Sequence, residues 1–380
     1  MLKVLHANDD NSTLSGAFII AWRVDRYLRE MGIAYDYISM DKFDRSSDAK
    51  FLIPNDSKTF GADFRRNRLI GLVKLPFYVY RVIKENDYKI IHIDCDYTYK
   101  ALLYAIPAKM LGVRTIVHSH TTGLAGDYQF LKLLVHKLSN KILSIFTDKY
   151  IGCSKEAAEW LIPKKRINSD SVVFNGIDLE NFKYDEDKRN KWRKKMGLSN
   201  ELVIGNVGSI CARKNQSFLV DVLYEVKKKK SDVVLLLVGP GVEEYVSQIK
   251  QKVDDLHLTG SVIFYGMTTN TVELLNVMDV FAFPSFVEGA PLALYEAEAT
   301  GLNCIMSNTV SLDAVITNYV KVKPVDKGAK CWSDAIIDFS ESINNRENRK
   351  VDAKYGLKQM AITLKSIYLD NKEGYDASIN

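Results

Sequence analysis

Two glutamates lie beside a predicted helix start in the segment 281–301, which reads FAFPSFVEGAPLALYEAEATG. An apolar strand is expected to end at Pro284. Pro291 is expected to open a helix, because proline lacks the N–H that a helix start leaves unbonded. Glu288 then lies on the loop and Glu296 in the second turn of the helix. Both carboxylates are therefore predicted to face the cleft at the end of a parallel strand.

The loop between these glutamates supplies backbone donors. The amides of Gly289 and Ala290, together with the positive end of the helix dipole, could bind an anion or sugar hydroxyls. The alternative is that the glutamates are surface carboxylates on a solvated helix, as is expected for Glu298. A pair of glutamates alone favours this alternative, so the surrounding sequence has to decide.

A second segment, 203–216, combines a glycine turn with basic side chains and reads VIGNVGSICARKNQ. A strand is expected to run through Gly208 and Ser209 into a helix. In that arrangement backbone amides and a basic side chain can bind a diphosphate. Arg213 and Lys214 are the basic candidates. The alternative is that this segment is an ordinary turn between a strand and a helix and binds no ligand.

Two histidines alternate at the end of another predicted strand, in the sequence VHSHTT from residue 117. His118 and His120 point to the same side of that strand, whose carboxyl end opens onto a ligand cleft. No cysteine or carboxylate cluster beside them in the sequence completes a set of metal ligands. We therefore expect no metal, with His118 in the core and His120 at the cleft.

The first segment closely resembles the donor-binding motif of the family-four retaining glycosyltransferases. That motif has two glutamates separated by seven residues in a P-S-x-x-E-G-x-P-x-x-x-x-E-A-x-A-x-G frame, and every fixed position is present here. The resemblance implies that Glu296 holds the ribose hydroxyls of a nucleotide and that Glu288 lies near the transferring sugar. It also implies donor contacts along the loop and helix start, at Gly289, Ala290, Pro291 and Leu292.

The second segment fits the same family less completely. The family's V-G-R-x-x-x-x-K-N element has an arginine directly after its second glycine, where this chain has Ser209. Lys214 matches the family's lysine, which implies that it neutralises the leaving diphosphate. Arg213 is a candidate replacement for the missing arginine, and Gly208 and Ser209 are expected beside the phosphates.

Matches in the first half of the chain are looser. His120 matches the family's strand-end histidine near the transferring sugar and its phosphate. Gly16, after the polar loop 9–15, matches a glycine turn near the diphosphate or acceptor, although this chain has one glycine where two are common. By this resemblance the catalytic residues are His120, Glu288 and Lys214, and no metal is required.

The elements that must position these residues alternate between short β-branched runs and longer periodic segments, which is typical of parallel sheets with crossover helices. In the first half, strands are expected at residues 2–6, 34–39, 89–93, 115–119, 149–152 and 171–174, and helices at 17–31, 69–84, 100–111 and 157–162. In the second half, strands are expected at 202–207, 233–238, 262–265, 280–283 and 303–306, and helices at 215–229, 242–256, 271–278 and 291–300.

The predicted fold class is α/β, with two facing Rossmann-like doubly wound domains of the GT-B type and the active site in the cleft between them. Residues 1–175 form the acceptor-binding domain and residues 176–354 the nucleotide-sugar-binding domain. The charged stretch 178–195 is read as a linker or domain entry. A helix at about 355–380 could pack back on the first domain.

Composition limits the function classes. The 380 residues are 47% hydrophobic and 26% charged, as in ordinary globular proteins, and the net charge of +5 does not call for nucleic acid. The five cysteines are scattered without zinc or disulfide spacing. The start of the chain lacks a signal-peptide pattern, so a cytoplasmic protein is expected.

Two basic and apolar stretches could contact an anionic membrane at the inner face of the cell membrane. The first is 64–84, with Arg65, Arg66, Arg68, Lys74, Arg81 and Lys84, interrupted by Pro76. The second is 130–141, with Lys132, His136, Lys137 and Lys141. The alternative is that both are amphipathic helices whose basic faces meet water.

The preferred function is a retaining transfer of a sugar from a nucleoside diphosphate, expected to be UDP, to a saccharide or lipid-linked saccharide in polysaccharide biosynthesis. The chain looks most similar to bacterial capsular and exopolysaccharide enzymes. One alternative is a nucleotide-sugar epimerase or hydrolase on the same fold, which product identity without an acceptor would reveal. Another is a non-catalytic carbohydrate-binding relative, for which Ser209 is the one hint.

Overall fold

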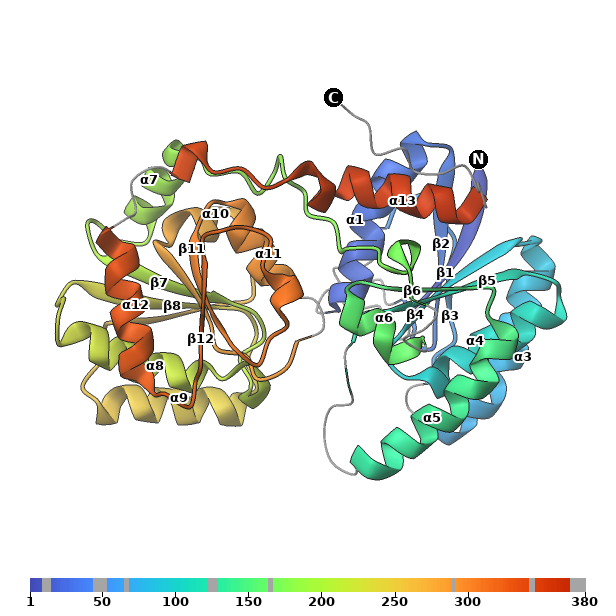
Figure 1. The fold of residues 1–380 in the computed structure, drawn as a ribbon, viewed down its shortest axis with the longest axis horizontal. Coiled ribbons are helices and arrows are strands. Elements are labelled where there is room, and N and C mark those ends of the chain that lie inside the picture. The colour runs from blue at the N-terminus through green and yellow to red at the C-terminus, as the bar shows by residue number, and fades with distance from the viewer. Residues whose placement is uncertain are drawn as a thin grey trace. The chain divides into compact units, whose positions relative to one another are not determined.

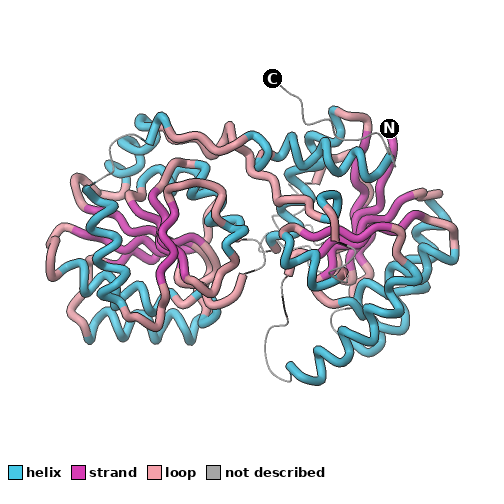
Figure 2. The backbone as a smooth tube through the Cα atoms, viewed as in Figure 1, coloured by secondary structure: helices cyan, strands magenta, loops and turns pink. Residues whose placement is uncertain are grey.

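The computed structural model describes residues 1–8, 15–43, 53–64, 68–121, 123, 129–162, 167–288, 291–341 and 346–369. The chain divides into two compact units (Figures 1 and 2). One unit combines Met1–Gly176 with Gly356–Asn380, and the other is Ile177–Tyr355. Each unit is a six-stranded parallel sheet covered by helices, so both are Rossmann-like and the predicted fold class is confirmed.

The sheet of the first unit has the strand order β3-β2-β1-β4-β5-β6. Its strands are β1 (Leu2–Ala7), β2 (Ile33–Ser39), β3 (Thr59–Gly61), β4 (Ile90–Cys95), β5 (Arg114–Ser119) and β6 (Lys149–Gly152). Its helices are α1 (Gly16–Glu30), α3 (Arg68–Asn86), α4 (Thr98–Met110), α5 (Gln129–Phe146), α6 (Lys155–Leu161) and α13 (Leu357–Leu369). The order reverses direction at β1 and β4, so the carboxyl ends of these two strands flank the crevice where such sheets bind ligands.

The sheet of the second unit has the order β12-β11-β10-β7-β8-β9. Its strands are β7 (Leu202–Val207), β8 (Val233–Val238), β9 (Val262–Gly266), β10 (Val280–Phe283), β11 (Asn303–Ser307) and β12 (Val320–Lys323). Its helices are α7 (Glu186–Lys195), α8 (Gln216–Lys227), α9 (Glu243–Asp255), α10 (Thr271–Val277), α11 (Leu292–Ala299) and α12 (Ala329–Glu341). The corresponding reversal lies between β7 and β10.

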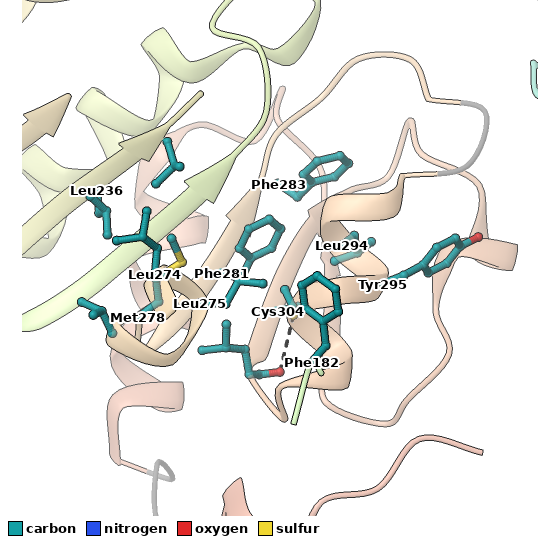
Figure 3. Packing of buried hydrophobic residues seen from close by; sticks show 14 of the residues in the cluster. Phe182, Leu236, Leu274, Leu275, Met278, Phe281, Phe283, Leu294, Tyr295 and Cys304 are labelled. Carbon is teal, nitrogen blue, oxygen red and sulfur yellow. Dashed lines mark hydrogen bonds between the residues drawn. The ribbon is translucent and has the colours of Figure 1, made fainter. Parts of the chain in front are cut away.

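The core beside β10 fixes the start of α11 (Figure 3). Phe281 and Phe283 alternate on β10, are fully buried, and stack with ring centroids 6.0 Å apart. Leu294 on α11 packs in the same cluster. Burying each such side chain stabilises the fold by about 1.5–3 kcal/mol. The loop between β10 and α11, which carries Glu288, is thus anchored on both sides.

The last described helix, α13, packs against α1 in the first unit (Figure 1). The Tyr368 hydroxyl lies 2.5 Å from His92 Nδ1 and 2.6 Å from the Tyr35 hydroxyl, all buried. Arg114 also donates to the Tyr368 carbonyl at 2.9 Å. The end of the described chain therefore completes the core of the unit that begins it.

Several elements differ from the sequence-based expectation. The strand expected at 171–174 is wrong, because residues Ser169–Ser171 form a 3-10 turn and Val172 makes only an isolated bridge with Gly152. Helix α7 occupies the stretch expected as a linker. Strands β3 and β12 and helix α12 were not expected.

Helix α3 continues through Pro76, so the expected interruption there is wrong. No helix within the described residues has both the length and the apolar composition needed to span a bilayer.

Candidate functional site

Both predicted basic side chains of the second unit meet the first glutamate. Lys214 Nζ lies 2.7 Å from Glu288 Oε1 and 5.1 Å from the centroid of the Phe283 ring. Arg213 Nη1 lies 3.4 Å from the same carboxylate oxygen and donates to the Val287 carbonyl at 3.0 Å. Two cations thus share one carboxylate, and the group keeps an excess positive charge that suits an anionic ligand.

The turn that carries these cations is held by hydrogen bonds. Fully buried Gln216 donates through Nε2 to Asn206 Oδ1 at 3.2 Å and to the Ser209 carbonyl at 3.0 Å. Its Oε1 accepts from the Cys211 amide at 3.3 Å. Sequence reasoning gave Gln216 no role, although a glutamine at the first residue of a helix has a donor and an acceptor that can bond the preceding loop.

Two glycines let the backbones of neighbouring turns touch behind Lys214. Gly208 has φ +146° and Gly239 has φ +135°, in a region that side-chain-bearing residues rarely adopt. A Cβ on Gly239 would lie 2.2 Å from the Gly208 carbonyl oxygen. A Cβ on Gly208 would lie 3.9 Å from Lys214 Nζ. The turn at Gly208 is therefore placed by its contact with Gly239.

Gly239→Ala is expected to lower the free energy of unfolding by more than the about 1–3 kcal/mol of backbone strain alone, because the clash is with backbone. Gly260→Ala is the matched control, since Gly260 has φ +84° and no atom within 4 Å of an added Cβ. Urea denaturation of both variants measures the difference. Equal losses in the two would show that the contact with Gly208 is unimportant.

The second glutamate lies in α11, directly after the fixed core. Pro291 precedes the helix and is buried, Leu292 is its first residue and packs on the core, and Glu296 is 7% exposed. Both glutamates of the pair thus belong to one loop and helix, as the spacing predicted. Gly289 and Ala290 lie outside the described residues.

Glu298 does not face solvent, and the expectation that it would is wrong. It is 1% exposed and accepts from the Thr317 hydroxyl at 2.6 Å and the Ile316 amide at 3.1 Å. Burial outweighs these hydrogen bonds and raises the pKa of Glu298 to about 7. Helix α11 is buried almost all round, which its apolar sequence LALYEAEA could have indicated.

In the first unit, His118 lies on β5 and His120 directly follows this strand, and a carboxylate that sequence reasoning missed lies beside them. Parallel pairing of β4 and β5 aligns Asp94 with His118. His120 Nε2 lies 3.1 Å from Asp94 Oδ1. His118 is 1% exposed, in the core as expected. The alternating pattern His92-Ile-Asp94 at the end of the preceding strand is the signal that could have revealed this neighbour.

The histidines here differ in charge. Burial lowers the pKa of His92 to about 3 and that of His118 well below its ordinary value. Burial also opposes a charge on His120, but the charge of Asp94, the hydrogen bond to it and the Cys153 thiol outweigh burial and raise its pKa to about 10. Among these three, His120 alone is an imidazolium at neutral pH.

The remaining predicted residues lie as follows. Gly16 is the first residue of α1, whose N-cap Ser15 accepts from the Phe18 amide. The preceding loop, 9–14, lies outside the described residues. Ser209 is half-buried, and its backbone carbonyl accepts the hydrogen bond from Gln216 Nε2.

Comparison with known proteins places each unit in a recognised group. Residues 188–355 match the family "Glycosyl transferases group 1", and residues 14–181 match "Glycosyltransferase Family 4". The two matches together take in most of the chain.

Among curated proteins, an Escherichia coli UDP-Gal:alpha-D-GlcNAc-diphosphoundecaprenol alpha-1,3-galactosyltransferase is 28% identical over 67% of this chain and 66% of its own length. The Staphylococcus aureus capsular polysaccharide biosynthesis glycosyltransferase CapH is 26% identical over 65% of this chain and 66% of its own length. The matched region thus spans slightly less than two thirds of each relative.

Among solved structures, HepE of Anabaena in complex with UDP and glucose superposes with a TM-score of 0.76 at 16% identity. The superposition covers 97% of this chain and all of HepE. At that identity the likeness concerns the fold.

Proposed function

Because the chain belongs to glycosyltransferase family 4, we propose that it transfers a sugar, with retention at the anomeric carbon, from a nucleoside-diphosphate donor to a saccharide or lipid-linked saccharide acceptor. One observation carries the proposal: Lys214 and Arg213 converge on Glu288 in the same loop and helix that present Glu296. The proposed donor is a UDP-sugar, since UDP is named for both the galactosyltransferase relative and the HepE complex.

In this proposal the second unit binds the donor. Glu296 accepts hydrogen bonds from the ribose hydroxyls, and Lys214 and Arg213 contact the diphosphate. Negative charge builds on the diphosphate as the glycosidic bond breaks, so these cations stabilise the transition state more than the ground state. Glu288 holds Lys214 in place before the donor binds and lies near the transferring sugar. The leaving phosphate accepts the acceptor's proton, and the two cations act in place of a metal ion.

A transfer assay in excess EDTA tests this function. The intact protein is incubated with a panel of UDP- and GDP-sugars and a diphosphate-lipid-linked N-acetylglucosamine, and the disaccharide product and its anomeric configuration are followed by NMR. We expect one UDP-sugar to give a product that keeps the donor's configuration. Conversion of donor to an isomeric nucleotide sugar without acceptor would instead favour the epimerase. No product with any donor, with or without Mg²⁺, would contradict the proposal.

We further propose that α3 and α5 of the first unit contact an anionic membrane that carries the acceptor. Among the described side chains of helix α5, six large apolar ones are exposed, at Phe130, Leu134, Val135, Leu138, Ile142 and Ile145. Helix α3 exposes Ile70, Val73 and Phe77. Exposed basic residues lie among them, at Lys74, Arg81, Lys84, Lys137 and Lys141. Both helices pack on α4.

This combination suits anionic lipid, because apolar side chains enter the interface while each basic residue adds about 1 kcal/mol near the surface. His136 takes no part, since it is buried and its Nε2 lies 3.1 Å from the Trp160 carbonyl. Arg65 and Arg66 lie outside the described residues.

Co-sedimentation with vesicles tests the membrane surface. We expect binding to phosphatidylglycerol-containing vesicles at low salt and weaker binding at high salt. The double variant Phe130→Ser/Leu138→Ser should bind several-fold less. The control Val242→Ser/Met267→Ser removes two apolar side chains of the second unit that are also more than half exposed. Equal binding by the two double variants would exclude α5 as the contact.

A further inference from the structure

A buried carboxylate accepts a hydrogen bond from the predicted catalytic histidine of the first unit. Asp94, at the end of β4, has a side chain that is 5% exposed. Its Oδ1 accepts from His120 Nε2 at 3.1 Å, and its Oδ2 accepts from Asn8 Nδ2 at 2.8 Å. Because both oxygens are engaged, by groups from β5 and from the end of β1, the carboxylate cannot rotate without losing a hydrogen bond. The orientation of His120 is therefore fixed by its buried partner.

The other titratable groups around this pair leave His120 as the cation. His6 and His92 face Asp94 at 3.6 and 3.8 Å, and burial lowers the pKa of both. His92 Nε2 lies 3.2 Å from His118 Nδ1. The Cys153 thiol is near His120 and favours its charged form. Burial opposes the charge of Asp94, but its interactions with the His6, His120 and His92 imidazoles, including the hydrogen bond from His120, outweigh burial and hold its pKa below the ordinary value.

The arrangement fits an ion pair better than a metal centre. Ligand atoms of Asp94, His118 and His120 lie within 4.8 Å of one another, as do those of His6, His92 and Asp94. A structural zinc takes four protein ligands and a catalytic zinc takes three, so the number of ligands in each group does not decide between a metal and an ion pair. The distances from Asp94 to His120 and Asn8 are those of ordinary hydrogen bonds, in which these nitrogens donate.

We propose that Asp94 is a positioning residue that keeps His120 doubly protonated, with Nε2–H fixed on Asp94, so that the imidazolium charge acts on an anionic oxygen of the bound substrate. His120 Nδ1 is itself buried, and the Cys153 thiol interacts with the ring and favours its charged form. A fixed positive charge in a site from which water is largely excluded stabilises the negative charge that develops in a transition state. The inference rests on the proposed transfer, because it assigns His120 to that reaction.

Asp94→Asn keeps an oxygen that can accept from Nε2–H but removes the charge. Wild-type kcat should be nearly constant from pH 6 to 9, because His120 stays protonated. In Asp94→Asn, kcat should fall as pH rises from 5 and lie about 10²-fold or more below wild type by pH 9, with a smaller change in KM, because His120 loses its proton near its ordinary pKa or below. Asp36→Asn is the control: it removes another buried carboxylate, bonded to Tyr88 and Lys3, and should leave the profile flat.

A histidine NMR titration of the intact proteins gives a readout independent of turnover, with the His120 signal assigned by its loss in His120→Gln. His120 should stay protonated to pH 9 in the wild type and titrate below 7 in Asp94→Asn. Parallel pH profiles of the two proteins, or a wild-type His120 that titrates near 6.5, would overturn the inference. Loss of wild-type activity in EDTA that Zn²⁺ restores would also overturn it, in favour of a metal. If the proposed transfer itself is wrong, neither the wild type nor any variant forms product. If only the role of Asp94 is wrong, product still forms, and kcat depends on pH in the same way in the wild type and in Asp94→Asn.

Discussion

Lys214→Ala should lower kcat by about 10²–10³-fold, the usual cost of removing one preorganised group that stabilises transition-state charge. Lys214 is 14% exposed at its side chain and lies over the Phe283 ring, so its charge acts where water is largely excluded. Arg213 cannot fully replace it, because its side chain is 48% exposed and its charge is screened more. Initial rates with saturating donor measure the effect.

Lys250→Ala is the matched control for this prediction. Lys250 also lies over a phenylalanine ring, with Nζ 5.6 Å from the Phe264 centroid, but on the exposed helix α9. Its removal should leave kcat unchanged. A loss of less than about threefold in Lys214→Ala, with the control at wild-type activity, would remove Lys214 from the transition state.

Glu298→Gln should raise the free energy of unfolding at pH 8 by up to about 3 kcal/mol. The reason is that a carboxyl group whose pKa is raised in the folded protein destabilises the fold at pH values where it is ionised. The unfolded chain releases this proton near 4.5, whereas the folded protein holds it until about 7. Folded protein thus binds more protons between these values, so stability falls as pH rises from 4.5 to 7 and is constant above. Glutamine keeps an acceptor for Thr317 and Ile316 without the charge.

Urea unfolding at pH 5 and pH 8 measures the difference between wild type and Glu298→Gln. The variant's advantage should be small at pH 5 and reach its full size at pH 8. Glu244→Gln, on the exposed start of α9, controls for loss of a negative charge and should give no such trend. An advantage that is equal at both pH values would show that Glu298 is already ionised in the folded protein at pH 5.

The sequence predicted those parts of the fold in which the spacing of apolar residues agrees with the turn-forming residues that bound each strand or helix. Strands β7, β8 and β10 begin and end where the β-branched and aromatic runs do. Helix α7 was missed because EDKRNKWRKK has almost no apolar stripe, and its stability comes instead from contacts such as Arg193 with Asp279. Strand β12 alternates valine with lysine at a half-exposed edge, which weakens the burial signal.

The candidate site was predictable where its residues are neighbours in sequence. Glu288 and Glu296 share one loop and helix, and Arg213 and Lys214 share one turn. That the two basic residues converge on Glu288 depends on strand order in space. Asp94 likewise reaches His120, and Asn8 reaches Asp94, only because β1, β4 and β5 lie side by side. Composition and spacing do not encode such long-range pairing, so these partners required the structure.

The central claim is that the second unit binds a nucleoside diphosphate through Glu296 and the cations of the glycine turn. Calorimetric titration of the intact wild-type protein with UDP in excess EDTA, beside Glu296→Ala, tests it most directly. We predict saturable binding to the wild type and affinity lower by about tenfold or more in the variant, the effect of losing hydrogen bonds to a charged group. Equal affinity in the two proteins, or no binding of UDP or GDP to the wild type, would contradict the account.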